Sequence, residues 1–256
     1  MIKINRINKI VVVFLSVFII MFLIVAPKTF AYGWGVSKNR YHETPDVGFY
    51  KKELQGTDSY YVGDTNKKEI YLTFDAGYDN GVLEKILDIL KEKNVKSTFF
   101  VTGDFLTRQE KITKRIYLEG HIIGNHTWNH KNITKINKDK LKEEIEKVEN
   151  KYYNITGEKM IKFFRPPEGE FSKESLLNVK SLGYKTFFWS IAYKDWETNK
   201  QHGGDYGYKA IMNNIHNGAI VLLHTVSQDN LECLPRVIDD LRSEGYTIKN
   251  LNEMSF

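Results

Sequence analysis

From about residue 69 onward, short apolar runs alternate with longer stretches in which apolar residues recur at helical spacing. The apolar runs have the length of β-strands and predict strands at 69–75, 97–102, 121–126, 161–165, 185–192, 219–224 and 246–251. Strands that alternate with amphipathic helices are typical of a parallel sheet. The pattern therefore predicts an α/β domain.

Helical periodicity fills the gaps between these runs. The first such stretch carries apolar residues at Val82, Leu83, Ile86, Leu87 and Leu90. Further helices are predicted near 105–118, 138–153, 172–182, 206–216 and 229–243. In the helix at 138–153, an apolar stripe faces the core while interspersed Lys and Glu residues form a solvated face.

The order of these elements favours a parallel barrel over a doubly wound open sheet, because no glycine-rich phosphate-binding fingerprint follows the first strand. Residues 32–68 lack sustained periodicity and are interpreted as an irregular N-terminal extension. Residues 69–256 are interpreted as the catalytic domain.

The first 31 residues differ in character from the rest. They have a basic start, an apolar run at 10–26, and small residues Thr29 and Ala31 that suit a signal-peptidase site. We interpret this segment as a secretory signal peptide. A run of this length is at the short limit for crossing a bilayer, so an uncleaved membrane anchor is the alternative. Either reading predicts an extracytoplasmic protein, secreted or anchored at the cell wall.

The net charge of +5 suggests an acidic partner until its distribution is considered. Four basic residues and no acidic ones lie in the first 31 residues, which leaves 33 basic against 32 acidic residues. The remainder is nearly neutral, and no nucleic-acid partner is expected. Cys233 is the only cysteine, which excludes an internal disulfide and a cysteine-based zinc site.

Residues with catalytic chemistry lie at the carboxyl ends of the predicted strands, where the active sites of parallel barrels form. Asp75 ends the first strand and Arg165 the fourth. A charge at the end of an apolar strand needs a partner or a function. Asp75 as a helix N-cap and Arg165 as a purely structural partner remain the alternatives.

Three histidines lie at other strand ends. His126 and His130 are four residues apart, a spacing that on a helical turn directs both imidazoles to one point and suits a divalent metal. Two surface histidines are the alternative. His224 closes the sixth strand and is either a satisfied core residue or an acid oriented by Asp195.

Together these segments resemble the polysaccharide deacetylase family, the carbohydrate esterases of family four with a NodB homology domain. The resemblance runs from about residue 69 to 251 and rests on five ordered motifs. The motif residues are 73–81 (TFDAGYDNG), 124–127 (GNHT), 188–192 (FWSIA), 195–196 (DW) and 222–230 (LLHTVSQDN). The resemblance implies a distorted parallel (β/α)7 barrel. The finer match is to the branch that deacetylates N-acetylmuramic acid on the way to the muramic δ-lactam of the spore cortex.

The resemblance also implies roles for individual residues. Asp75 would be the general base, tuned by Arg165, and His224, oriented by Asp195, would protonate the leaving amine. His126 and His130 would hold the metal. The backbone N–H near Glu168 would help hold the oxyanion. Tyr78 and Trp196 would contact the substrate. This division suits amide hydrolysis, which requires water activation, oxyanion stabilisation and protonation of the amine.

One position departs from the wider family. Most members have a second aspartate after the base as a third metal ligand, whereas this sequence has Ala76. We therefore expect a divalent cation, with zinc the first choice, to be weakly bound. The muramic-acid branch also tends to lack this aspartate.

The sequence thus predicts a monomeric N-acetylmuramic acid deacetylase acting on peptidoglycan glycan strands. The alternatives are a deacetylase of N-acetylglucosamine in peptidoglycan or chitin oligomers, and a catalytically silent relative that binds glycans.

Overall fold

A curled parallel sheet forms the centre of the fold. In the computed structural model, which describes residues 30–36 and 41–255, this eight-stranded sheet has the order β10, β3, β4, β5, β6, β8, β2, and β9 also pairs with β3. The strands are β2 Ser59–Tyr60, β3 Glu69–Ala76, β4 Thr98–Val101, β5 Ile122–Asn125, β6 Phe163–Phe164, β8 Lys185–Phe187, β9 Ile220–His224 and β10 Thr247–Lys249. All of their pairings are parallel.

The sheet closes on itself through β9. One edge of β9 pairs with β3, and a parallel bridge between Ile191 and Val221 links it to the segment that follows β8. The seven predicted strands correspond to β3, β4, β5, β6, β8, β9 and β10. The prediction of a distorted parallel (β/α)7 barrel is therefore confirmed, and β2 is an additional strand from the N-terminal extension.

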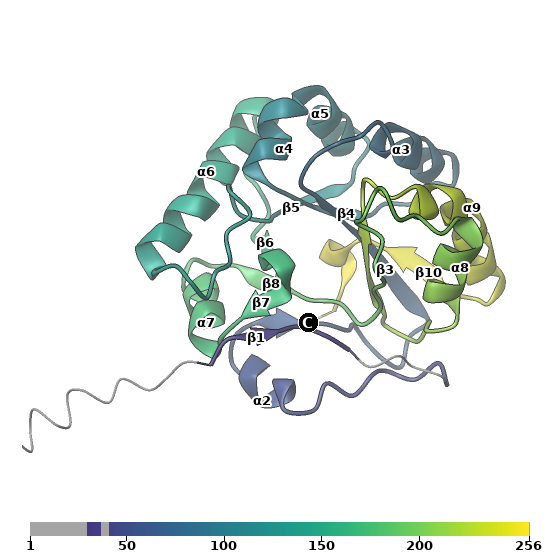
Figure 1. Cartoon of the computed structure of the whole chain (residues 1–256), viewed down its shortest axis with the longest axis horizontal. Coiled ribbons are helices and arrows are strands. Elements are labelled where there is room, and N and C mark those ends of the chain that lie inside the picture. Colours follow the sequence, from purple (N-terminus) through teal and green to yellow (C-terminus); the bar gives the residue numbers. More distant parts are fainter. Residues whose placement is uncertain (1–29, 37–40, 256) are drawn as a thin grey trace, which may run out of the picture. The chain divides into compact units, whose positions relative to one another are not determined.

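Helices surround the sheet (Figure 1). They are α2 Tyr50–Leu54, α3 Leu83–Glu92, α4 Gly103–Arg108, α5 Glu110–Leu118, α6 Lys138–Thr156, α7 Lys173–Ser181, α8 Gly204–Met212 and α9 Gln228–Ser243, with short 3-10 turns η1 Pro167–Gly169 and η2 Leu251–Glu253. The single helix predicted at 105–118 is wrong in detail, because Gln109 leaves the helical conformation and separates α4 from α5.

Alternation along β3 divides the core in two. Ile70, Leu72 and Phe74 belong to the apolar cluster shared with the helices, whereas Tyr71 belongs to the inner cluster with Phe100. Because successive side chains of a strand point to opposite faces, Asp75 shares the inner side with Tyr71. The same alternation that buries the core therefore directs the carboxylate of Asp75 to the inside of the barrel.

The N-terminal extension is more regular than its sequence suggests. Between residues 32 and 68 lie β1 Tyr32–Gly33, α2 and β2. β1 pairs antiparallel with β7 Glu170–Phe171, and β2 adds to the main sheet beside β8. Residues 31–256 form one compact unit.

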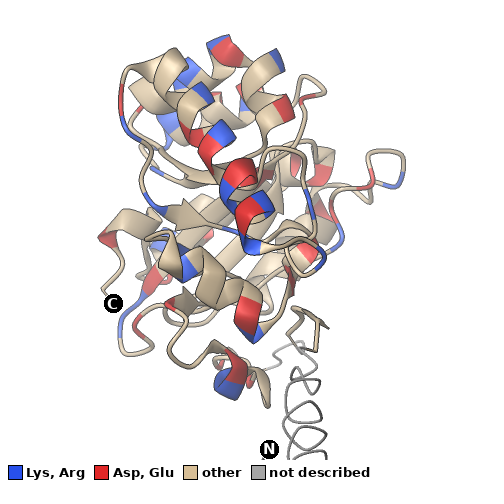
Figure 2. Cartoon of the chain, turned by 90° about the vertical axis from the view of Figure 1, so that its left-hand side faces the viewer, with Lys and Arg blue, Asp and Glu red and all other residues tan. Residues whose placement is uncertain are grey.

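Charged residues of both signs are interleaved on the helices that face the viewer in Figure 2. Within the ranges 30–36 and 41–255, no helix is long and apolar enough to cross a membrane. The predicted signal or anchor at 1–31, with its apolar run at 10–26, lies almost wholly outside the described residues and stays a prediction.

Candidate active site

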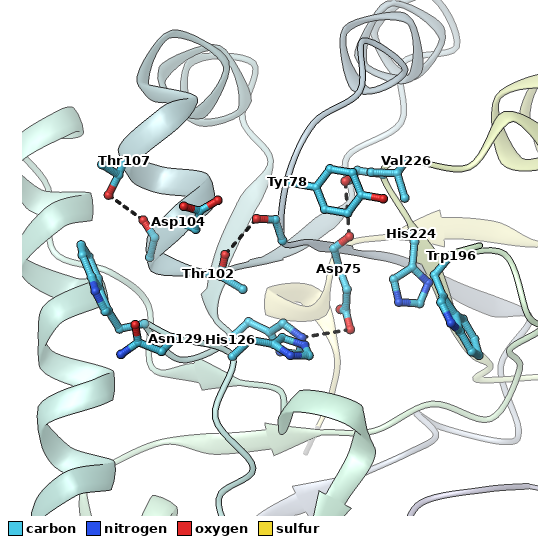
Figure 3. A pocket seen from close by; sticks show the side chains of 15 residues that line it. Asp75, Tyr78, Thr102, Asp104, Thr107, His126, Asn129, Trp196, His224 and Val226 are labelled. Atoms are coloured by element: carbon cyan, nitrogen blue, oxygen red, sulfur yellow. Dashed lines mark hydrogen bonds and ion pairs between the residues drawn. The ribbon is translucent and has the colours of Figure 1, made fainter. Parts of the chain in front are cut away.

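Adjacent strands bring the predicted base and acid together. In the parallel pairing of β3 with β9, Asp75 lies opposite His224. His126 follows β5, and Arg165 follows β6. A cavity of about 740 Å³ opens over these strand ends and is lined by Asp75, His126, His130 and His224 among others (Figure 3).

Asp75 is held in place by a fully buried guanidinium. Arg165 Nη1 donates to Asp75 Oδ1 at 2.8 Å, and Arg165 Nη2 donates to Thr73 Oγ1 at 2.8 Å. Burial alone would raise the pKa of Asp75, but its interactions with Arg165 and with the histidines beside it outweigh burial and lower the pKa. Asp75 is therefore ionised at neutral pH, as a general base must be.

His126 presents one nitrogen to the cavity. Its Nδ1 lies 2.8 Å from the backbone oxygen of Arg165, and because that oxygen can only accept, Nδ1 carries the proton. The bare Nε2 lies 3.6 Å from Asp75 Oδ2. Burial lowers the pKa of His126 to about 4, so the ring is neutral. A neutral imidazole with one bare nitrogen has the form that a metal ligand requires.

His130 lies close to His126, but the backbone between them is not the predicted helical turn. The ring centroids of the two histidines are 5.0 Å apart, but residues 126–130 form a loop and not a helical turn. Thr127 and His130 adopt left-handed backbone conformations, with φ of 65° and 52°. The helical-turn prediction is therefore wrong, although the convergence it was meant to explain is present.

His224 and Asp195 form the second charged pair. His224 Nδ1 donates to Asp195 Oδ1 at 2.7 Å, and the His224 backbone N–H donates to Oδ2 at 2.7 Å. Burial would lower the pKa of His224, but the charges of Asp195 and Asp75 overcome it and raise the pKa. The Asp195 carboxylate is fully buried. The arrangement therefore favours a protonated imidazole beside the ionised Asp75.

A base, an acid and two converging imidazoles around one cavity suit hydrolysis of an amide, and comparison with known proteins gives the same answer. Residues 62–187 match the family model described as polysaccharide deacetylase. The chain is 45% identical to peptidoglycan-N-acetylmuramic acid deacetylase PdaA of Bacillus subtilis, over 87% of this chain and 85% of that protein. The chain belongs to the polysaccharide deacetylase family.

Two further comparisons agree with this assignment. The structure of Bacillus subtilis PdaA, a family 4 carbohydrate esterase, matches with a TM-score of 0.85 and 43% identity, covering 88% of this chain and 96% of that chain. A peptidoglycan-N-acetylglucosamine deacetylase of Bacillus cereus is 35% identical over 76% of this chain and 70% of that protein. This polysaccharide deacetylase is thus a hydrolase with the family's distorted (β/α)7 barrel.

His126 and His130 are the residues that would hold a metal ion at this site. Within residues 30–36 and 41–255, no group of three or more His, Cys, Asp or Glu side chains is arranged to hold a metal. Ala76 is fully buried in the apolar cluster with Leu72 and Phe74, and it is not among the residues that line the cavity. The donor set therefore fits an ion held by His126 and His130 and completed by other ligands.

The predicted substrate residues are placed differently from one another. Tyr78 and Trp196 are each 49% exposed and line the cavity, and the Trp196 ring lies 5.5 Å from that of His224. Glu168 lies in η1 with a left-handed φ of 60° and is not among the cavity-lining residues. The oxyanion role of the backbone N–H near Glu168 stays a prediction.

Sequence reasoning gave no role to several residues that build this site. Asn230 Nδ2 donates to Asp195 Oδ2 at 2.5 Å from the first turn of α9. Trp128 lines the cavity and lies against Gly103, where a Cβ atom would approach its ring to 2.2 Å. Only a residue without a side chain fits there. Gly103 directly follows the strand predicted at 97–102, and a glycine at such a place indicates a close approach of neighbouring groups.

Proposed function

We propose that this enzyme removes the N-acetyl group from N-acetylmuramic acid residues of peptidoglycan, a step toward the muramic δ-lactam of spore cortex. The observation that carries the proposal is the facing of two charged pairs, Asp75 with Arg165 and His224 with Asp195, across one pairing of β3 with β9. The choice of sugar rests on the 45% identity to PdaA, against 35% to the N-acetylglucosamine deacetylase.

Asp75 accepts a proton from the attacking water, whose oxygen then bonds to the acetyl carbon. The guanidinium of Arg165 keeps Asp75 ionised and oriented for this step. His224 donates its proton to the sugar nitrogen as the carbon–nitrogen bond breaks, so that the amine leaves neutral and acetate is released. Acid and base steps of this kind each contribute roughly 10²–10⁴-fold to the rate.

A divalent cation held by His126 and His130 would polarise the acetyl carbonyl and the attacking water. We propose zinc, weakly bound because Ala76 supplies no third ligand. Trp196 and Tyr78 would pack against the sugar ring, since exposed aromatic rings beside a cavity suit the apolar faces of a pyranose.

We also propose that residues 1–31 export the protein and that it acts as a monomer outside the cytoplasm, secreted or anchored at the cell wall or spore cortex. Cleavage after Ala31 would leave the compact unit at residues 31–256 almost entire. Sequencing the N-terminus of the mature protein from the cell wall fraction tests this part.

Mass spectrometry of glycan fragments tests the substrate. The enzyme is incubated separately with peptidoglycan stripped of peptides, with intact peptidoglycan and with chitin oligomers. We expect muramic residues of the stripped glycan to lose the mass of an acetyl group, and a further loss of water would indicate lactam closure. Efficient deacetylation of glucosamine without a muramic product would assign the enzyme to N-acetylglucosamine instead.

A further inference from the structure

The loop between β5 and α6 has a conformation that its own residues do not favour. Thr127 and His130 both have positive φ, and Thr127 is β-branched. A left-handed conformation is uncommon for any residue other than glycine and rare for a β-branched one, so it persists only where the surroundings impose it. The loop contributes Trp128, Asn129 and His130 to the wall of the cavity.

A buried carboxylate on α6 holds the middle of this loop. Glu144 is fully buried, its Oε2 accepts the backbone N–H of Asn129 at 2.7 Å, and its Oε1 accepts Asn129 Nδ2 at 2.7 Å. The nearest cation, Lys140 Nζ, is 3.9 Å from Oε1. Removing a carboxylate from water is costly, so both hydrogen bonds are needed to keep it there.

The two ends of the loop are tied down separately. Asn125 Oδ1 accepts the backbone N–H of Thr127 at 3.0 Å, and Thr127 Oγ1 accepts that of Lys131 at 3.1 Å. Glu144 binds the residue between Trp128 and His130. It does not itself line the cavity. Its effect on the reaction must therefore pass through Asn129.

We infer that Glu144 is a positioning residue for the deacetylation: through its two bonds to Asn129, it fixes the loop that presents His130 and Trp128 to the cavity. The inference rests on the proposed role of His130 but not on the identity of the sugar. A carboxylate suits this task because both of its oxygens accept, and Asn129 offers two donors.

An exchange of the two side-chain groups tests the inference. In Glu144→Leu, both acceptor oxygens are lost, and the backbone N–H and the side-chain Nδ2 of Asn129 are left without them. In Asn129→Asp, a carboxylate faces a carboxylate. The double variant Glu144→Gln/Asn129→Asp restores both bonds with the side-chain donor and acceptor reversed. Because small displacements of reacting groups are costly, we expect each single variant to lower kcat about 10–100-fold and the double variant to recover most of that loss.

Acetate release is measured on whichever acetylated glycan the wild type deacetylates, and kcat and KM are determined separately. The value of kcat is expressed per folded molecule, with the folded fraction taken from urea unfolding. Glu143→Gln is the matched control, because Glu143 is the neighbouring residue on α6 and its side chain is 44% exposed and paired with Lys140 and Lys147. It should retain the wild-type kcat. Recovery in the double variant supports the inference.

Two results would overturn it. If the single variants are less stable but their folded molecules retain the wild-type kcat and KM, Glu144 is only structural. If kcat falls in the single variants and stays low in the double variant, the loss does not act through the bonds to Asn129. A wild type that acts only on glucosamine changes the proposed substrate, and the same comparison on that substrate still decides the role of Glu144.

Discussion

Replacing Asp195 with asparagine changes the acid half of the site by one group. The carboxylate of Asp195 accepts three hydrogen bonds: His224 Nδ1 on one oxygen, and the His224 backbone N–H and Asn230 Nδ2 on the other. An asparagine has one acceptor oxygen, so its NH₂ group must face a donor. The NH₂ group faces the fewest donors when it lies opposite His224 Nδ1, and Nδ1 must then be unprotonated.

The expected loss follows from this exchange. The imidazolium loses a hydrogen bond to a charged partner, which is worth about 1.5–3 kcal/mol. At about 1.4 kcal/mol per factor of ten, this lowers the ratio of protonated to neutral imidazole by roughly 10–150-fold. We therefore expect kcat/KM of Asp195→Asn at neutral pH to fall by about that factor. His224→Ala, which removes the acid altogether, should lose about 10²–10⁴-fold.

The pH profile distinguishes this cause from a general disturbance. In the wild type, burial lowers the pKa of His224, Asp195 and Asp75 raise it, and Arg165 opposes them, with a net rise. Activity that needs the protonated ring is lost as pH rises through this pKa. Without the charge of Asp195 the pKa falls, so the alkaline limb of kcat/KM should move to lower pH.

Acetate release is measured across pH for the two single variants and for the double variant. Residues that act as a unit are non-additive, so the double variant should be within about threefold of His224→Ala. Losses that multiply, or an alkaline limb that stays in place in Asp195→Asn, would refute the view that Asp195 acts through the imidazole.

Three further predictions concern the rest of the site and the core. Asp75→Asn should abolish turnover and lower the free energy of unfolding by about 3–5 kcal/mol, because Arg165 loses its buried counter-charge; wild-type kcat in folded protein would remove the base role. His126→Ala should bind zinc more weakly than the wild type when both are titrated by calorimetry, and equal affinity would exclude the imidazoles as ligands. Phe99→Ala should lower the free energy of unfolding in urea by about 3–5 kcal/mol. Leu118→Ala, at a side chain that is 69% exposed, should change this free energy by about 0.5 kcal/mol or less. Similar losses of stability in the two variants would contradict the core described for β4.

The strands of the barrel could be predicted because burial on both faces leaves continuous apolar runs, and the catalytic residues could be predicted because they end those runs. β2 could not, since Ser59 and Tyr60 form a short strand that depends on β8 for its pairing. The separation of α4 from α5 depends on the conformation of one residue, Gln109, in an otherwise helical pattern.

Glu144 departs from the pattern of its helix. The sequence predicts a solvated face for the Lys and Glu residues of this helix, yet Glu144 is fully buried. It lies three residues after Leu141 and four before Val148, two members of the apolar stripe. That spacing puts all three on one face of the helix. A carboxylate within an apolar stripe therefore indicates a buried hydrogen-bond donor beside it. The identity of that partner, Asn129, depends on the loop conformation and was not available from spacing.

The pairing of β3 has a consequence for how the enzyme loses activity. β3 is bonded to β4, β9 and β10, so its amide hydrogens are shielded by three neighbours. Such segments exchange their hydrogens with solvent only when much of the structure opens, whereas loops exchange through small local openings. Asp195 lies in the loop between β8 and α8. Under mild denaturant the segment that orients the acid should therefore take up deuterium, and cease to support catalysis, while the strand that carries Asp75 is still intact.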